Sequence, residues 1–318
     1  MTAPPDLADL LDRVHVVALP MRVRFRGITI REVALIDGPA GWGEFGAFVE
    51  YRPPEAASWL AAGIESAYQA PPTTRRDRIP INATVPAVAP ERVPELLSRF
   101  PGARTAKVKV AEPGQNLNDD VMRVETVRGL VPTVRVDANG GWSVDEAVSA
   151  AAALGPLEYI EQPCRTVAEL AEVRRRIDTP VAADESIRKA DDPLHVVRSG
   201  AADVAVLKVA PLGGTSALLK IAEQIDIPVV ISSALDSAVG IATGLRAAAA
   251  LPALRHACGL GTNQLFIQDV TDVANPADGY LPVEPVTPDP ARLEGLKASP
   301  QRRDWWLRRI ISCYRLLS

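Results

Sequence analysis

Short strand-like runs recur along this chain at a nearly constant interval, and this repeat limits the folds that the chain can adopt. Eight runs follow one another from residue 79, and their starts lie 22 to 28 residues apart. Between them lie Ala-, Leu-, Glu- and Arg-rich segments with apolar residues at helical spacing, such as 143–155 and 237–251. Strands that alternate with helices in this way indicate a parallel sheet. The runs span 79–85, 105–110, 133–137, 157–162, 180–184, 202–209, 228–233 and 255–260.

Eight such units favour a sheet that closes on itself. We therefore predict an α/β fold of the (β/α) TIM-barrel type, in a modified form whose last strand and helix are irregular. The alternative is an open doubly wound sheet, but no GxGxxG motif follows the first run. Ahead of the repeat, residues 14–50 contain strand-like runs and residues 55–70 show a helical pattern, which together predict a small N-terminal α+β domain.

A stretch rich in Pro, Thr and Arg, residues 69–80, is the best boundary between these two parts. We predict an α+β domain over 1–78, a barrel over 79–285 and a C-terminal segment over 286–318. The last segment ends in RRDWWLRRIISCYRLLS. This composition suits a membrane-surface helix or a helix that packs its tryptophans on the first domain, and we favour the second.

Composition excludes several classes of protein. The net charge of -4 argues against a nucleic-acid partner, because phosphate binding needs a basic surplus. The three cysteines are widely spaced without a CxxC pair, as expected for reduced thiols. The first residues, MTAPPDLADLLDRV, lack the basic start and apolar core of a signal peptide, and no apolar run is long enough to span a membrane. We expect a cytoplasmic protein with no membrane partner.

Charged residues stand near the ends of five consecutive strand-like runs. From Lys109 the following intervals are 28, 24, 23 and 24 residues, which is the repeat of the barrel itself. The carboxyl ends of barrel strands build the active site, so these side chains should share one pocket. Taken singly, the lysines could face solvent, and two of the acids could cap helices. The residues are Lys107 and Lys109, Asp137, Glu161, Asp184, and Lys208.

Three carboxylates without histidine are the ligands that a hard divalent cation such as Mg²⁺ prefers. Lysines beside them suggest proton chemistry on a carbon acid, because a buried lysine near a second ammonium group can lose its proton, whereas arginine cannot. Only 6 of the 35 basic residues are lysines, and half of these lie at the predicted site. His256 could line the pocket but is better explained as a packed or hydrogen-bonded residue. Gly213 and Gly214 could hold an anion or simply form a turn.

These residues resemble the enolase superfamily, and within it the muconate-lactonizing-enzyme subgroup. The resemblance is carried by KVK at 107–109, DANGGW at 137–142, EQP at 161–163, ADES at 183–186 and LKVAPLGG at 207–214. The N-terminal WGEFGAF at 42–48 resembles the capping domain of that family. The resemblance implies an enolase-like barrel with Mg²⁺ as cofactor, for which Mn²⁺ can substitute. It also implies metal ligation by Asp137, Glu161 and Asp184, and catalysis by Lys109 and Lys208 with Lys107 in support.

Within the subgroup the chain is most similar to the branch that dehydrates a cyclohexadiene carboxylate to o-succinylbenzoate in menaquinone biosynthesis. INATVPA at 81–87 and ISSALDSAVG at 231–240 carry this likeness. A small-molecule carboxylate is thus the expected partner. N-succinylamino acid racemisation and cycloisomerisation or epimerisation remain alternatives, although CGLGTNQLF lacks the acidic pair usual in dipeptide epimerases. A catalytically idle barrel that only binds ligands is a further alternative. We expect substrate contacts from Ser232, Ser233, Gly259, Gly261, Asn139 and Arg24.

Overall fold

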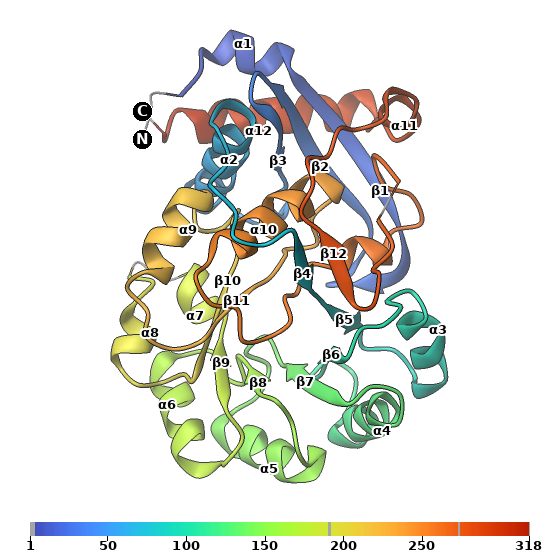
Figure 1. The fold of residues 1–318 in the computed structure, drawn as a ribbon, viewed down its shortest axis with the longest axis vertical. Helices are drawn as coiled ribbons and strands as arrows, with labels where there is room; N and C mark the ends of the chain where they lie inside the picture. The colour runs from blue at the N-terminus through green and yellow to red at the C-terminus, as the bar shows by residue number, and fades with distance from the viewer. Residues whose placement is uncertain (1–3, 190–191, 273, 318) are drawn as a thin grey trace.

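The computed structural model of the protein describes residues 4–189, 192–272 and 274–317, and its first part is an antiparallel sheet (Figure 1). After the short helix α1 (Leu7–Asp12), the strands β1 (Val14–Phe25), β2 (Ile28–Gly38) and β3 (Gly41–Phe45) pair in that order. Helix α2 (Pro53–Tyr68) packs on β3 at very short range. A Cβ atom on Gly43 would lie 1.9 Å from the carbonyl oxygen of Gly63, so this contact requires glycine.

A curled parallel sheet of seven strands forms the second part, and the strands lie side by side in chain order. Their interior residues are almost all buried on both faces, which explains why the runs are apolar. The strands are β5 (Asn82–Val85), β6 (Thr105–Lys109), β7 (Thr133–Asp137), β8 (Ile160–Glu161), β9 (Val181–Ala183), β10 (Val204–Leu207) and β11 (Val229–Ile231).

The eighth predicted strand, 255–260, closes the barrel through isolated bridges instead of a continuous ladder. Cys258 pairs with Ile81 next to β5, and Gly259 pairs with Ser232 next to β11. The amide of Cys258 donates to the Pro80 carbonyl at 2.7 Å, and that of Gly259 donates to the Ile231 carbonyl at 2.9 Å. The segment is short because the chain turns at once into the 3-10 helix η2 (Thr262–Leu265). The predicted α/β barrel with an N-terminal α+β domain is confirmed, including its irregular last strand.

Helices follow the strands and cover the outside of the barrel (Figure 1). Three of them begin with a capping box, in which a side chain and a backbone amide exchange hydrogen bonds: Asn116 with Asp119, Ser143 with Glu146, and Thr166 with Glu169. The helical elements are η1 (Pro90–Arg92), α3 (Val93–Leu97), α4 (Leu117–Arg128), α5 (Val144–Leu154), α6 (Val167–Arg176), α7 (Glu185–Arg188), α8 (His195–Arg198), α9 (Thr215–Ala222) and α10 (Ala238–Ala250).

The C-terminal part of the chain returns to the N-terminal sheet. Strand β12 (Tyr280–Pro282) pairs antiparallel with β4 (Arg78–Pro80), and helices α11 (Pro290–Gly295) and α12 (Pro300–Tyr314) follow. The indole of Trp306 is fully buried and donates to Glu32 of β2 at 2.9 Å. Figure 1 shows α12 beside the three-stranded sheet. The helix therefore packs its tryptophan on the first part of the molecule.

None of the helices that the structure describes has both the length and the apolar character needed to cross a membrane.

Candidate active site

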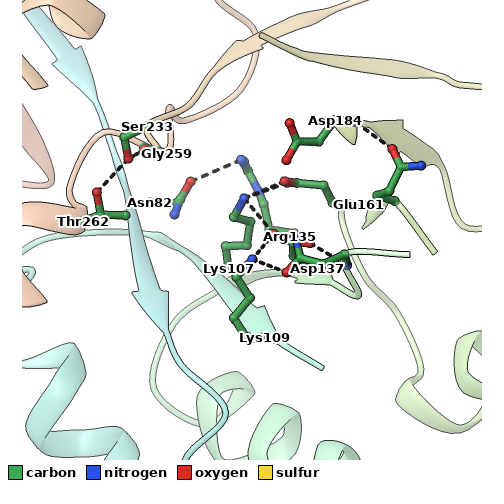
Figure 2. Close-up of polar contacts among 12 residues, drawn as sticks. Asn82, Lys107, Lys109, Arg135, Asp137, Glu161, Asp184, Ser233, Gly259 and Thr262 are labelled. Carbon is green, nitrogen blue, oxygen red and sulfur yellow. Dashed lines mark hydrogen bonds and ion pairs between the residues drawn. The ribbon is translucent and has the colours of Figure 1, made fainter. Parts of the chain in front are cut away.

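Strand register brings the predicted charged residues to one level at the carboxyl edge of the barrel. Lys109 of β6 pairs with Asp137 of β7, and Asp137 pairs with Glu161 of β8. Glu161 pairs with Ala182 of β9, so Asp184 projects from the same face two residues further on. In Figure 2 Glu161 points toward Lys107, Asp137 lies beside Lys109, and Asp184 stands next to Glu161. The regular spacing in the sequence thus corresponds to one cluster in space.

Lys107 is the most deeply enclosed of the lysines. Its Nζ atom donates to both carboxylate oxygens of Glu161 at 2.8 Å and lies 3.3 Å from Asp137 Oδ2. Burial alone would lower the pKa of Lys107, but the charges of Glu161 and Asp137 outweigh it and raise the pKa well above the usual range. Lys107 is therefore a fixed cation. Burial, together with the charge of Asp137, raises the pKa of Glu161 to about 7.

Lys109 has the opposite electrostatic setting. Its Nζ atom donates to Asp137 Oδ2 at 2.5 Å and to Asn139 Oδ1 at 2.6 Å. Burial lowers the pKa of Lys109, and the neighbouring charge of Lys107 acts in the same direction against the attraction of Asp137. Asn139 has a positive φ of 48° and donates its backbone amide to Asp137 Oδ1 at 3.0 Å. The turn after β7 thus fixes both the acid and the amide that hold this lysine.

Lys208 follows β10 and belongs to a second group of charges. Its Nζ atom donates to Asp184 Oδ2 at 2.6 Å, and Arg188 donates to the other oxygen of Asp184 at 3.0 Å. Burial would raise the pKa of Asp184, but Lys208 and Arg188 outweigh it and lower the pKa to about 2. Arg188 also donates to the hydroxyl of Tyr51 at 3.2 Å, which links this group to the N-terminal domain.

Gln162 is a site residue that sequence reasoning missed. Its Oε1 atom accepts from the backbone amides of Asp184 at 3.0 Å and Ser186 at 3.1 Å. Its Nε2 atom donates to the Cys164 carbonyl at 2.9 Å and to Ser186 Oγ at 2.8 Å. The side chain is fully buried, and the backbone has a positive φ of 41°. The sequence signal was the position of this glutamine, between the strand-end acid Glu161 and a proline. A polar side chain at such a buried position needs hydrogen-bond partners, which would have indicated a role in holding the neighbouring loops.

A cavity of about 30 Å³ lies over the lysines and is lined by four of the predicted substrate contacts: Asn139, Ser232, Ser233 and Gly259. The hydroxyl of Ser233 donates to the Gly259 carbonyl at 2.7 Å. Phe25 and Arg26, at the turn after β1, form the roof. Because this space holds only one or two water molecules, a ring-sized substrate needs a wider cavity than the one in this structure.

Two other predicted contacts lie elsewhere. Arg24 is exposed and does not line the cavity, because alternation along β1 turns it away from the face of Phe25. Arg26, two residues further along the chain, lines the cavity instead. Gly261 is packed against Phe100 and Ile81, where an added Cβ atom would lie 2.9 Å from the Phe100 ring and 3.0 Å from Ile81. Its role is close packing beneath the cavity wall.

Further features named in the sequence have structural partners of their own. His256 Nδ1 lies 2.9 Å from Glu158 Oε1, away from the cavity, in agreement with the hydrogen-bonded interpretation. The glycine pair Gly213–Gly214, which could hold an anion, faces a carboxylate of the protein itself. Glu65 of α2 accepts from the amide of Ser216 at 3.0 Å, and its carboxylate lies 2.5 Å from where a Cβ atom on Gly214 would stand.

A larger cavity of about 870 Å³ opens between Arg22 of β1, Arg99 and Arg292. None of the charged residues at the strand ends lines it. Because those residues are the predicted site residues, the smaller cavity at the carboxyl edge of the strands is the candidate active site.

The donor set fits a hard divalent cation in kind. Asp137, Glu161 and Asp184 are at most 1% exposed, and three buried carboxylates without nitrogen or sulfur ligands suit Mg²⁺. In this structure each carboxylate turns toward a lysine. Accordingly, within the described ranges no three Asp, Glu, His or Cys side chains converge closely enough to hold an ion as they stand.

Comparison with known proteins gives the family. Residues 16–67 match the model for "Enolase N-terminal domain-like", and residues 94–290 match that for "Enolase C-terminal domain-like". The chain is 74% identical over 317 residues to the o-succinylbenzoate synthase of Mycobacterium marinum (strain ATCC BAA-535 / M), covering 99% of this chain and 97% of the relative. It is 73% identical over 316 residues to that of Mycobacterium leprae (strain TN), covering 98% and 95%.

Solved structures agree with the fold. A muconate lactonizing enzyme from Pseudomonas fluorescens, complexed with muconolactone, has a TM-score of 0.75 at 23% identity and covers 90% of this chain and 98% of its own. An N-succinyl Arg/Lys racemase from Bacillus cereus ATCC 14579 has a TM-score of 0.73 at 20% identity, with 90% and 97% covered. Identity this low supports the fold alone. The identity with the sequence relatives and the two family matches show that the chain belongs to the o-succinylbenzoate synthases, a family of lyases in the enolase superfamily.

Proposed function

We propose that this enzyme converts 2-succinyl-6-hydroxy-2,4-cyclohexadiene-1-carboxylate to o-succinylbenzoate, a step of menaquinone biosynthesis, by syn elimination of water. The observation that carries the proposal is the identity of 72–74% with o-succinylbenzoate synthases over nearly the whole chain. The site supports it, because a carbon acid needs a buried base and a stabilised anion, and lysines and carboxylates meet at one edge of the barrel.

Lys109 is the base in this proposal. Its Nζ atom takes the proton next to the ring carboxylate, and the electron pair of that C–H bond passes into an enediolate. The hydroxyl group then leaves from the same face, so the protonated Lys109 is placed to return a proton and release water. Burial favours the neutral form of Lys109, as a base requires, and Asn139 and Asp137 orient the amine. The ring becomes aromatic as the C–O bond breaks.

Lys208 and Lys107 act as cations. Lys208 lines the same cavity as Lys109, and we propose that its ammonium group stabilises the charge of the enediolate and contacts the ring face. Lys107 keeps its proton because Glu161 holds it from both oxygens. Its constant charge disfavours protonation of the neighbouring Lys109 and so helps to keep the base neutral.

Asp137, Glu161 and Asp184 would hold Mg²⁺, or Mn²⁺ in its place. A bound divalent cation supplies charge stabilisation for the substrate carboxylate as the α-proton leaves. The lysines now pair with these oxygens, so each carboxylate has a cation to exchange for the metal. The charge crowding that raises the pKa of Glu161 would be relieved in the same way.

The test follows absorbance of the aromatic product with wild-type enzyme and Mg²⁺. Lys109→Arg should abolish dehydration, because a guanidinium group keeps its proton at any working pH. Lys208→Arg should be severely impaired with some residual rate, since its role is electrostatic. Lys220→Arg, on the exposed face of α9, serves as the matched control. A Lys109→Arg enzyme that dehydrates faster than Lys208→Arg would exchange the two roles.

Parallel assays separate the alternatives. Racemisation of N-succinylamino acids needs a lysine on each face of the substrate, and both Lys109 and Lys208 are present. Activity on those substrates without aromatisation would favour the racemase function. A protein that only binds ligands would catalyse no exchange of substrate α-protons in deuterated water, with or without Mg²⁺.

A further inference from the structure

Two arginines are buried at the junction of the N-terminal domain, the barrel and α12, and hydrogen bonds to carbonyl groups surround them instead of direct ion pairs. Arg31 of β2 is 2% exposed, and Arg309 of α12 is 7% exposed. Among the residues that the structure describes, neither guanidinium lies within ion-pair distance of a carboxylate. The charges of Glu44 and Asp236 act on Arg31 only from beyond ion-pair distance. A buried cation without a directly paired carboxylate is unfavourable unless hydrogen bonds replace its water. The hydrogen bonds of these two arginines must therefore compensate for the cost of burying their charges.

Both arginines hold the same loop, residues 46–51, by its backbone carbonyl groups. Arg309 donates to the carbonyl of Ala47 at 3.1 Å, to that of Phe48 at 2.7 Å and to that of Tyr51 at 2.8 Å. Arg31 donates to the carbonyl of Gly46. A loop without regular secondary structure thereby has its acceptors satisfied from two sides. We call this set of contacts the arginine clamp.

Arg31 extends the clamp to the wall of the catalytic cavity. Its Nε atom donates to the carbonyl of Leu235 at 3.0 Å, and Leu235 lines the cavity with a positive φ of 64°. A non-glycine residue in this conformation persists only when its surroundings hold it. Gly46 leaves room for the guanidinium, because a Cβ atom there would lie 2.8 Å from Arg31 Nη2. The clamp therefore joins the 46–51 loop to the loop after β11.

The clamped loop carries two side chains that reach the site. The ring of Phe48 lies 4.2 Å from the guanidinium carbon of Arg26, which roofs the cavity. The hydroxyl of Tyr51 accepts from Arg188, and Arg188 in turn donates to Asp184. A shift of the loop would therefore reach both the roof and one of the three carboxylates.

We infer that Arg309 and Arg31 are positioning residues for the reaction, and that α12 belongs to the catalytic apparatus through its hold on residues 46–51. Neither arginine lines the cavity. They act through Phe48, Tyr51 and Leu235. The inference rests on the proposed function for its kinetic readout, but the hold on the loop is a separate physical property that can be measured without substrate.

The test compares Arg309→Met with Arg309→Lys and with Arg308→Met, whose side chain is exposed on the same helix. Hydrogen–deuterium exchange in residues 46–51 should be faster for Arg309→Met, slightly faster for Arg309→Lys and unchanged for Arg308→Met. Since a displacement of about 1 Å in a catalytic site can cost roughly 100-fold, kcat/KM for dehydration should fall by about that factor. Arg309→Lys keeps a cation and part of the hydrogen bonding, so it should recover about half of that loss on a logarithmic scale and remain below the wild-type rate.

Each result decides the inference. If Arg309→Met loosens the loop while kcat/KM stays within about threefold of Arg308→Met, the arginine is merely structural and the inference is wrong. Unchanged exchange in residues 46–51 overturns it as well. Should Arg309→Met fail to fold, Arg309→Lys with unaltered exchange and kinetics would refute it. If the wild-type enzyme forms no aromatic product, the proposed function fails, while deuterium exchange still decides whether the clamp holds the loop.

Discussion

Gln162 does not line the cavity, but we predict that its buried side-chain amide contributes strongly to stability and activity. Gln162→Met keeps the length and volume of the side chain but removes its four hydrogen bonds. The amides of Asp184 and Ser186 and the carbonyl of Cys164 would then lose a partner. The side chain is 0% exposed, so bulk water cannot replace these bonds. The variant therefore tests the hydrogen bonds that hold the loop of Asp184 and Ser186, without a change in side-chain volume.

The magnitude follows from the groups left without partners. A buried donor or acceptor that loses its partner costs roughly 1–3 kcal/mol, and three backbone groups are affected. Some relaxation will occur, so we expect the free energy of unfolding to fall by about 4 kcal/mol, against a total of about 5–15 kcal/mol for a domain. Loss of a partner that orients a metal ligand typically lowers metal affinity or activity about 10–100-fold. We expect kcat/KM to fall within that range.

Urea unfolding followed by tryptophan fluorescence gives the change in free energy, and the absorbance assay gives kcat/KM. Gln301→Met, on an exposed position of α12, is the control and should change neither quantity. A Gln162→Met enzyme that loses less than about 1 kcal/mol and keeps full activity would show that these hydrogen bonds do not hold Asp184.

Three further predictions concern other parts of the molecule. Glu161→Gln should stay folded but lose roughly 100-fold or more in kcat and bind Mg²⁺ more weakly, measured by kinetics and metal titration; near-normal activity without added metal would contradict the ligand assignment. Gly43→Ala should destabilise the protein by roughly 3 kcal/mol in thermal unfolding, because its Cβ atom would meet the α2 backbone, whereas Gly295→Ala has open space and should be neutral. Burial raises the pKa of Asp269 to about 6, so the folded state keeps a proton that the unfolded chain releases above about pH 4. Stability from this group should decline as the pH rises from 4 to 6, and Asp269→Asn should flatten that part of the urea-unfolding profile, whereas an unchanged slope would reject the assignment.

Most of the barrel was predictable because its signals are local or periodic. The strand interiors are buried on both sides, which forces apolar runs, and helices such as α4, α5 and α6 begin with capping residues that are visible in the sequence. Asp137 and Glu161 could be placed at the same height in the barrel from the sequence. In parallel strands that pair in register, residues separated by one repeat of the chain lie side by side. In a fold built from repeated units, the spacing of residues in the sequence therefore predicts their positions in space.

Contacts between distant loops left no such signal. Arg24 and Arg26 are two residues apart. Alternation along β1 turns Arg24 away from the cavity, whereas Arg26 lines it from the turn that follows, where its φ is 50°. Gly261 differs from Gly259 because Phe100, far away in the sequence, packs against it. Arg309 could be recognised as part of a helix, but its partners lie about 260 positions earlier. Such contacts follow from the way the domains meet, which local sequence patterns do not encode.

The charge balance of the site gives a physical reason for the combination of substrate and metal that we propose. In the network of ion pairs at the carboxyl edge of the barrel, cationic and carboxylate side chains are equal in number, so the network is close to neutral when all of its members are charged. They are Lys107, Lys109, Lys208 and Arg188 against Asp137, Glu161, Asp184 and Glu185. Arg26, which lines the cavity, lies outside this network. A divalent cation among these carboxylates would add two positive charges to a buried space. The proposed substrate carries two carboxylates, so substrate and metal together leave the net charge of the site unchanged, whereas either one alone adds an uncompensated buried charge. Substrate should therefore tighten Mg²⁺ binding and Mg²⁺ should tighten substrate binding by the same factor, which calorimetric titration in both orders can measure. Independent binding of the two would show that the lysines, and not the substrate, balance the metal.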